Sequence, residues 1–311
     1  MNKKMLITGG CGFVGRHFAS HFSETYDVTI VDDMSSESSL YPEQWMPSLQ
    51  CSVKFIKANI IEYLKNTKES FDIVIHLAAV VGGRQNIENN PMDVAEDMNI
   101  DSFTINWCAK NNSRLIFFSS SAVYPVSYQT YDNHQKLYEN LMNFNDNFGV
   151  PDLTYGWAKM TGEYLCKIAH QKLGLQCIIY RPFSGYGEDQ NEVYPFPAII
   201  KRVINKENPL SIWSNSVRDF VHIDDIVQYV NATMFNFSDA TALNIGTSIG
   251  TSFMELASKA ATLCGYNPEI IILNDKPQGV YYRVSDSSID YSITLTQGIE
   301  KSINYLSKGI I

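Results

Sequence analysis

One glycine-rich turn limits the fold of this chain more than any other feature of its sequence. Gly9, Gly12 and Gly15 are spaced as G-x-x-G-x-x-G, directly after the apolar run Lys4–Thr8 and at the start of the helical pattern Phe13–Glu24. Glycine allows a tight turn, lets the backbone approach a pyrophosphate, and lets the helix pack closely against the strand. The helix N-terminus adds free N–H groups that attract phosphate. The turn therefore favours a dinucleotide site over a glycine-rich turn without a ligand.

Short β-rich runs alternate with helical patterns through residues 1–181, as in a parallel sheet with helices on both faces. The runs are apolar on both faces, which a sheet covered on two sides requires. We therefore expect an α/β fold with a Rossmann-like, doubly wound parallel sheet. The expected strands are Lys4–Thr8, Val28–Asp32, Val53–Ile56, Ile73–Leu77, Arg114–Ser119 and Gln176–Arg181, and the expected helices are Phe13–Glu24, Met92–Lys110 and Tyr155–Leu173.

The alternation loosens after Pro182, where a second and smaller region is expected. We expect residues 1–181 to form the dinucleotide-binding domain, with residues 219–247 returning to it, and residues 182–311 to form mostly a mixed α/β substrate-binding region. Residues 127–151 are rich in Asn, Asp and Tyr and are expected to form a surface excursion. The helices expected in the second region are Pro195–Asn205, Ile223–Met234, Ser252–Cys264 and Ile299–Tyr305, and the strands are Leu210–Trp213, Ala242–Ile245 and Glu269–Leu273.

The composition restricts the partners of this chain. A formal net charge of -9 over 311 residues disfavours a general nucleic-acid or anionic-membrane surface. No signal-peptide cleavage site and no membrane-spanning apolar run are visible, so we expect a cytoplasmic protein that binds neither membrane nor nucleic acid. Six cysteines lack any C-x-x-C pair and are expected to be reduced, mostly buried thiols without a bound metal, namely Cys11, Cys51, Cys108, Cys166, Cys177 and Cys264.

An acidic residue ends the second expected strand. A carboxylate at Asp32 can accept hydrogen bonds from the adenosine ribose and would repel a 2′-phosphate, which favours NAD over NADP. Asp33 is an alternative for the same contact. Both side chains could instead cap a loop.

Two further motifs indicate acid–base chemistry. Tyr155 and Lys159 form a Tyr-x-x-x-Lys pair that lies on one face of a helix, where the ammonium would favour the phenolate. The alternative is a surface i,i+4 pair. The fifth strand ends in Ser119, Ser120 and Ser121, and a hydroxyl there would face the ligand crevice. Spacing alone does not choose among the three serines or separate them from loop-capping hydroxyls.

Seven short segments resemble, in order, those of the extended short-chain dehydrogenases, and more narrowly of the nucleotide-sugar epimerases and dehydratases. They cover most of the chain, so the resemblance is specific. They are TGGCGFVG (Thr8–Gly15), VDD (Val31–Asp33), HLAA (His76–Ala79), FSSSAVY (Phe118–Tyr124), YGWAK (Tyr155–Lys159), YRPFSGYG (Tyr180–Gly187) and RDFVHIDD (Arg218–Asp225).

The resemblance implies an NAD-dependent enzyme with Ser120, Tyr155 and Lys159 as its catalytic residues. Asn59 stands where the family often has an aspartate beside the adenine, and Ser184 stands where an asparagine usually contacts the sugar nucleotide. The implied NAD contacts are Gly9, Gly12, Phe13, Val14, Gly15, Asp32, Asp33, Asn59, Ile60, Leu77, Ala78, Ala79, Asn99, Tyr155 and Lys159. The implied substrate contacts are Gly83, Arg84, Ser121, Ser184, Arg218 and Arg283, with the two last arginines on the diphosphate.

The departures from the family narrow the expected chemistry. Sugar 4,6-dehydratases have an Asp-Glu pair where this chain has Ser121 and Ala122, and 3,5-epimerases have a cysteine at Ala122. The remaining chemistry is oxidation at carbon 4 of a nucleotide-linked sugar, as a 4-epimerase or a net 4-dehydrogenase. A dehydratase or 4-ketoreductase is the alternative within the family, and a non-catalytic dinucleotide-binding sensor is the alternative of another class.

Three finer expectations also come from the resemblance. The segments at 80–84 and 279–286 resemble those of GDP-sugar enzymes, which favours a GDP-linked substrate. The family implies a homodimer built on the helices Met92–Lys110 and Tyr155–Leu173. It also implies a role in sugar biosynthesis for surface polysaccharide.

Overall fold

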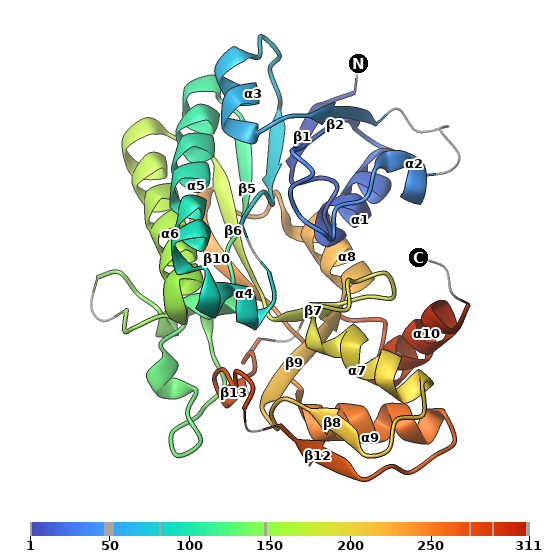
Figure 1. Ribbon diagram of the computed structural model, residues 1–311. Coiled ribbons are helices and arrows are strands. Elements are labelled where there is room, and N and C mark those ends of the chain that lie inside the picture. The colour runs from blue at the N-terminus through green and yellow to red at the C-terminus, as the bar shows by residue number, and fades with distance from the viewer. Residues whose placement is uncertain are drawn as a thin grey trace.

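The computed structural model describes residues 2–46, 53–80, 82–145, 148–273, 275–287 and 289–308, so Cys51 lies outside the described residues. Its largest unit is a seven-stranded sheet in the order β10-β6-β5-β4-β1-β2-β3, and each neighbouring pair is parallel (Figure 1). The expected doubly wound α/β sheet is thus confirmed. The strands are β1 (Lys4–Thr8), β2 (Asp27–Asp32), β3 (Lys54–Lys57), β4 (Ile73–His76), β5 (Arg114–Phe118), β6 (Cys177–Pro182) and β10 (Asp239–Ile245).

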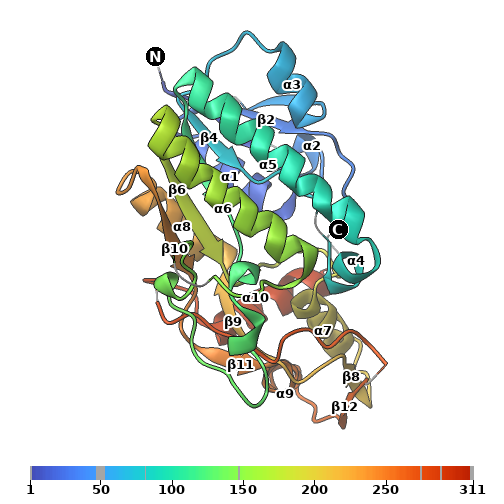
Figure 2. The ribbon, with the colours of Figure 1, turned by 90° about the vertical axis from the view of Figure 1, so that its left-hand side faces the viewer.

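Alternate residues of the buried strands face two different cores. Met5 and Ile7 of β1 pack with α1 (Phe13–Phe22) and α8 (Ile223–Thr233) on one face. The opposite core contains Leu6, next to them in the chain. It lies under α3 (Ile60–Asn66), α5 (Pro91–Asn111) and α6 (Leu153–Leu173), and Figure 2 shows α5 and α6 side by side across the sheet.

The strand order reverses between β1 and β4, and this point positions the site. The chain leaves β1 toward β2 and β3, then returns to β4 and continues to β5 and β6 on the other side. Ligands of open α/β sheets bind in the crevice that such a reversal leaves at the carboxyl ends of the strands.

The second unit has a separate apolar core beneath the carboxyl ends of the sheet (Figure 1). Strand β9 is central, because β11 and β13 lie on its two sides and β7 also pairs with it. Strands β8 and β12 form a separate pair. The elements are β7 (Ser184–Tyr186), α7 (Pro195–Ile204), β8 (Leu210–Ile212), β9 (Val217–His222), β11 (Gly250–Ser252), α9 (Phe253–Leu263), β12 (Ile270–Ile272), β13 (Tyr282–Arg283) and α10 (Leu295–Ser307).

Several short elements did not follow from periodicity. They are α2 (Pro42–Trp45), α3, α4 (Arg84–Asn89), β7, β9, β11 and β13, and most have too few residues to show a period. The expected surface excursion at 127–151 is also only partly right. Gln129 and Leu137 within it are fully buried, and Leu137 N donates to Val284 O at 2.9 Å.

Two expectations concern the state of the cysteines and the presence of a membrane-spanning helix. The five cysteines within the described part of the chain are free thiols, and all but Cys264 are buried. Over the same described ranges, no helix has both the length and the apolar character needed to cross a membrane.

Candidate active site

The glycine-rich turn forms a cradle between β1 and α1. A Cβ atom on Gly9, whose φ is 68°, would lie 2.8 Å from the backbone nitrogen of Ala78, and one on Gly15 would collide with Gly9 O. Glycine is therefore required for the turn and for the packing of α1 on β1. Within the described chain, no side chain caps the N-terminus of α1. The N–H groups of this first turn, which includes Phe13 and Val14, remain available to phosphate oxygens.

Asp32 organises this turn from the end of β2. Its buried carboxylate accepts hydrogen bonds from Cys11 N at 3.0 Å and Met34 N at 2.8 Å. Burial raises its pKa, and the two backbone donors act in the opposite direction. Asp33 is exposed and accepts from Ser35 N. Both carboxylates therefore cap loop backbone, and Asp32 is the one that contacts the glycine-rich turn.

The other positions expected near NAD are placed differently from one another. Leu77 and Ala78 follow β4, and their N–H groups donate to Thr8 Oγ1 at 3.1 Å each, which brings this loop, with Ala79 after it, beside the glycine-rich turn. Asn59 caps α3, where its Oδ1 accepts from Ile61 N at 3.0 Å, and Ile60 is buried. The amide oxygen of Asn59, at the position implied beside the adenine, therefore already accepts a hydrogen bond within the chain.

Asn99, another position expected near NAD, lies within α5. Its side chain is exposed, and it lies two residues from Asp97 and two from Asp101, which are both buried on another face of α5. Sequence reasoning missed these two aspartates. Their spacing of four within a helix was the available signal, because residues four apart share a face.

Geometry separates the three serines that follow β5. Ser119 donates to Glu163 Oε1 at 2.5 Å, and Ser121 is buried in the short 3-10 helix η1 (Ser121–Val123). Ser120 is the serine whose hydroxyl lowers the pKa of Tyr155 by hydrogen bonding, and its Oγ accepts from Ala122 N at 3.1 Å. Ser120 is therefore the serine placed beside the tyrosine.

Tyr155 and Lys159 lie one turn apart near the start of α6. Burial raises the pKa of Tyr155, the ammonium of Lys159 lowers it, and the carboxylates of Asp97 and Asp101 raise it. The expected effect of Lys159 is present, but in the protein chain alone it is outweighed. Burial also disfavours the charge on Lys159, yet Asp101 and Asp97 hold the pKa of this ammonium above its usual range.

Three arginines converge one turn before Tyr155. Arg84 Nη1 lies 2.8 Å from Asp152 Oδ1, and Arg283 Nη2 lies 2.8 Å from Asp152 Oδ2. Arg218 donates to two backbone carbonyls, of Val217 and Val280, and no carboxylate of the described residues is paired with it. Burial, together with the positive charges of Arg283 and Arg84, lowers the pKa of Arg218 to about 9. Glu88 Oε1 also lies 2.6 Å from Arg84 Nε, so the described residues set two carboxylates against three arginines, and an anionic ligand would balance the remaining positive charge.

Two expected substrate positions, Gly83 and Ser184, are placed by the backbone around them. Gly83 caps α4, and a Cβ there would lie 2.8 Å from Val193 O, so the loop before α7 passes directly over it. Ser184 begins β7 opposite Phe220 of β9.

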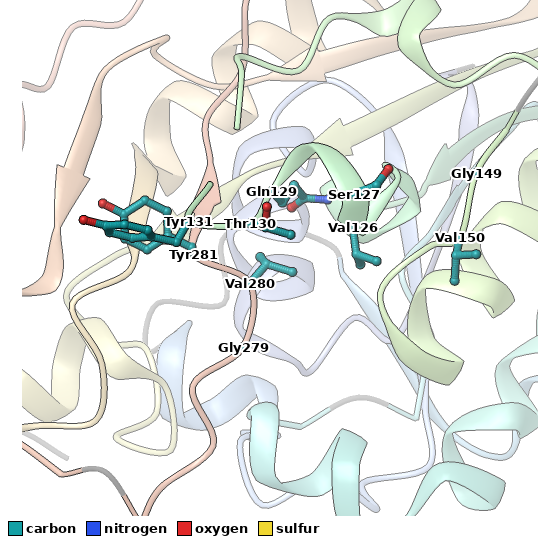
Figure 3. A pocket seen from close by; sticks show the side chains of 10 residues that line it. All are labelled: Val126, Ser127, Gln129, Thr130, Tyr131, Gly149, Val150, Gly279, Val280 and Tyr281. Carbon is teal, nitrogen blue, oxygen red and sulfur yellow. The ribbon is translucent and has the colours of Figure 1, made fainter. Parts of the chain in front are cut away.

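A cavity of about 610 Å³ opens next to the arginine cluster (Figure 3). Gly279, on its wall, connects the two features, because a Cβ there would lie 3.6 Å from Arg218 Nη2. Val126, Val150 and Val280 line it with apolar side chains, and the rings of Tyr131 and Tyr281 meet edge to face with centroids 4.9 Å apart.

Gln129, from the same loop, supports Arg283. Its Oε1 accepts from Arg283 Nε at 2.7 Å, while its Nε2 donates to Tyr124 O and Pro125 O. The segment 127–151 is thus part of the structure that orients an arginine of the cluster, a role that its polar composition did not suggest.

Together these features could serve the oxidation of an alcohol that is attached to an anion, with a bound dinucleotide as the hydride acceptor. A phenol paired with a serine hydroxyl can exchange a proton with a substrate oxygen, and three guanidinium groups can hold phosphate nearby. The described residues contain no group of three or more His, Cys, Asp or Glu side chains arranged to hold a metal ion.

Comparison with known proteins places the chain among similar enzymes. Residues 5–246 match the model of the NAD dependent epimerase/dehydratase family. A putative UDP-glucose 4-epimerase of Methanocaldococcus jannaschii is 28% identical over 98% of this chain and 99% of its own. GDP-L-colitose synthase of Yersinia pseudotuberculosis is 24% identical over 97% of each chain. A UDP-glucose 4-epimerase of Thermotoga maritima, solved with UDP-glucose, shares the fold, with a TM-score of 0.83 and 22% identity over 99% of this chain and 100% of that one.

Proposed function

This chain belongs to the NAD dependent epimerase/dehydratase family, and from that premise we propose that it oxidises carbon 4 of a nucleotide-linked sugar, as a 4-epimerase or a net 4-dehydrogenase. The observation that carries this proposal is the placement of Ser120, at the end of β5, beside Tyr155, with Lys159 one turn further along α6. A non-catalytic dinucleotide-binding sensor would have no need of this arrangement.

We assign the cofactor to the sheet unit and the substrate to the space between that unit and the second one. The uncapped N-terminus of α1, the glycine cradle and Asp32 suit the pyrophosphate and the ribose of NAD. When bound, NAD supplies the redox chemistry by taking a hydride from the sugar carbon and, in an epimerase, returning it to the other face.

The proton steps belong to the protein. Tyr155, as the phenolate, removes the proton from the hydroxyl on carbon 4, and Ser120 donates a hydrogen bond to the same oxygen as the ketone forms. Lys159 stabilises the phenolate electrostatically. The arginine cluster of Arg84, Arg218 and Arg283 holds the diphosphate, with Asp152 occupying part of that positive site in the chain alone.

The neighbours of Ser120 argue against β-elimination. The sugar 4,6-dehydratases that this chain resembles have an acid and a base at the positions of Ser121 and Ala122. Here both side chains are buried and neutral. A 4-ketoreductase uses the same residues in the reverse direction and is therefore the nearest alternative.

A GDP-linked sugar is our preferred substrate, as a precursor for surface polysaccharide. Arg84 and Arg283, which lie in the segments that resemble GDP-sugar enzymes, both belong to the cluster, and one relative is named GDP-L-colitose synthase. Another relative is named as a putative UDP-glucose 4-epimerase, so the affinities of the purified protein for GDP and for UDP must be compared directly. Tighter binding of UDP than of GDP to the purified protein would contradict the preference.

The test uses the purified protein with a panel of GDP- and UDP-linked hexoses, without added cofactor, and identifies products by NMR. A new 4-epimer without net NADH supports an epimerase, and a 4-keto sugar with NADH formed supports a dehydrogenase. A 4-keto-6-deoxy product, or no turnover by protein that carries NAD, contradicts the proposal. Tyr155→Phe must abolish turnover, whereas Tyr164→Phe, on the exposed side of the same helix, must retain it.

We also propose a cytoplasmic homodimer built on α5 and α6. Trp157 and Tyr164, one heptad apart on α6, contact Phe148 and Phe144 of the preceding loop but are still 40% and 48% exposed, which leaves apolar surface for a partner helix. Light scattering should give twice the chain mass, and Trp157→Glu should shift it to the monomer. A monomeric wild-type protein would contradict this part.

A further inference from the structure

The ammonium of Lys159 is held by a buried carboxylate on a neighbouring helix. Its Nζ lies 3.4 Å from Asp101 Oδ2 and 5.4 Å from the centre of the Phe117 ring. Asp101 is completely buried, as is Asp97 one turn earlier on α5. A buried charge without a partner is costly, so this ion pair fixes the position of the lysine head group.

Hydrogen bonds fix Asp101 in turn. His76 Nε2 lies 3.0 Å from Asp101 Oδ1, and His76 Nδ1 lies 2.7 Å from Thr8 Oγ1. Thr8 Oγ1 accepts from two backbone N–H groups, so its only proton goes to Nδ1. Nδ1 is therefore the acceptor, and His76 Nε2 donates its proton to Asp101. This chain joins the end of β1, at the glycine-rich turn, to Lys159.

Negative charge exceeds positive charge around the tyrosine. Asp97 Oδ1 accepts from Val80 N, and its Oδ2 has no partner among the described residues. Lys159 is thus one cation shared by two carboxylates and the phenol. Three other groups face this cluster among the described residues: His76 contacts Asp101, Tyr194 is a phenol, and Glu163 is paired with Arg181.

We propose that Asp101 is a positioning residue for the redox reaction. Its carboxylate binds the ammonium of Lys159, which is therefore shared between Asp101 and Tyr155, and this sharing sets the pH at which the phenol loses its proton. The inference rests on the proposed role of Tyr155. The proton balance is simple. The phenolate takes the proton of the substrate hydroxyl as the ketone forms, and the phenol returns it in the reverse step. Asp101 neither gains nor loses a proton in either direction.

The sign of the effect follows from the charges. Replacing Asp101 by asparagine keeps the shape and one of the two oxygen acceptors but removes one negative charge near the phenolate. It also leaves Lys159 less compensated. Both changes favour the phenolate, so Asp101→Asn should lower the pKa of Tyr155. We expect the acid limb of kcat/KM against pH to move down by about one pH unit, which is about tenfold more phenolate at low pH.

The experiment combines a pH profile with a direct titration in the NAD-loaded protein. The phenolate absorbance that Tyr155→Phe removes reports the titration of Tyr155 without turnover. Asp101→Glu keeps the charge and should keep the wild-type limb. Thr104→Val is the matched control, because Thr104 is a buried neighbour on α5 whose hydroxyl has no partner within the described chain, and it should change neither readout.

The outcomes separate the inference from the function on which it rests. The inference is supported if the acid limb of kcat/KM moves to lower pH in Asp101→Asn and stays at its wild-type pH in Asp101→Glu. An unmoved limb and titration, even with reduced turnover or stability, overturns it and leaves only a structural role for Asp101. If Asp101→Asn does not fold, Asp101→Ser removes the same charge and is judged by the same two readouts. Full turnover by Tyr155→Phe would instead overturn the proposed function.

Discussion

Three neighbouring serines at the end of β5 have different environments and should respond differently to substitution. Ser119 is bound to the buried Glu163, Ser120 to Tyr155, and Ser121 to the interior of η1. The spacing of the residues could not show which serine faces the ligand, because hydroxyl groups in adjacent loop positions have no periodicity that reveals their direction. The family resemblance selected Ser120, and the geometry agrees with that choice.

Replacing Ser120 by alanine should slow the reaction more than it weakens binding. The variant removes a hydrogen-bond donor to the oxygen on which charge develops, which typically costs about 10²-fold in kcat. Ser119→Ala is the comparison, because it should lower the free energy of unfolding by about 1–3 kcal/mol through loss of the bond to a buried carboxylate, with a smaller effect on kcat. Equal kcat values for the two variants would contradict the assignment.

Arg283→Met should act mainly on binding. Its guanidinium is held by Gln129 and Asp152 at one side of the cluster, so its loss removes a charge-assisted contact to the diphosphate. We expect KM to rise about 10- to 100-fold, for a loss of about 1.5–3 kcal/mol, with kcat changed much less. Arg114→Met is the control. Arg114 begins β5, at the end of this strand opposite the three serines, so its loss should leave KM unchanged. A fall in kcat alone would place Arg283 elsewhere in the mechanism.

At the scale of elements, long periodic segments were predictable and short ones were not. The strands with two buried faces and the helices α1, α5, α6, α7, α8 and α9 lie within a few residues of their expected bounds. Helix α3 has only seven residues and depends on the cap from Asn59, and β9 was hidden because its pairing partners are far away in sequence. Such elements form through tertiary contacts, which a local pattern does not contain.

An ion-pair cluster joins α1 to the loop after β7, and acid should break it. Arg16 Nε lies 2.7 Å from Asp189 Oδ2, and His17 Nε2 lies 2.9 Å from Asp189 Oδ1. Burial opposes the charge on Asp189, but His17 and Arg16 outweigh it and lower its pKa to about 2. A depressed pKa stabilises the fold above the unfolded value near 4, and this contribution is lost as pH falls from about 4 to about 2.

The wild-type protein should therefore lose about 2 kcal/mol more than Asp189→Asn over that range, because the variant has no carboxylate to protonate. Urea unfolding of both proteins at several pH values measures the difference. Parallel pH dependence in the two proteins would show that Asp189 contributes nothing through its charge.

For the whole molecule, the site is made by segments that are distant in sequence. Arg84 and Asp152 come from the large sheet unit, and Arg218 and Arg283 from the second unit, so the cluster exists only when both units are folded together. Individual site residues were predictable because their motifs are local. The partnership of Asp152 with two arginines, and of Asp101 with Lys159, was not, because no spacing in the sequence relates their members.

Redox chemistry at carbon 4 moves the hydrogen atom on that carbon, so an isotope label at carbon 4 follows the reaction itself. The purified protein would be given a nucleotide sugar labelled with deuterium at carbon 4, and the product would be examined by NMR. The account predicts a primary isotope effect, with the label returned to the inverted carbon 4 by an epimerase or found in NADH from a dehydrogenase. Solvent exchange at carbon 3 or 5, with the label undisturbed at carbon 4, would contradict it.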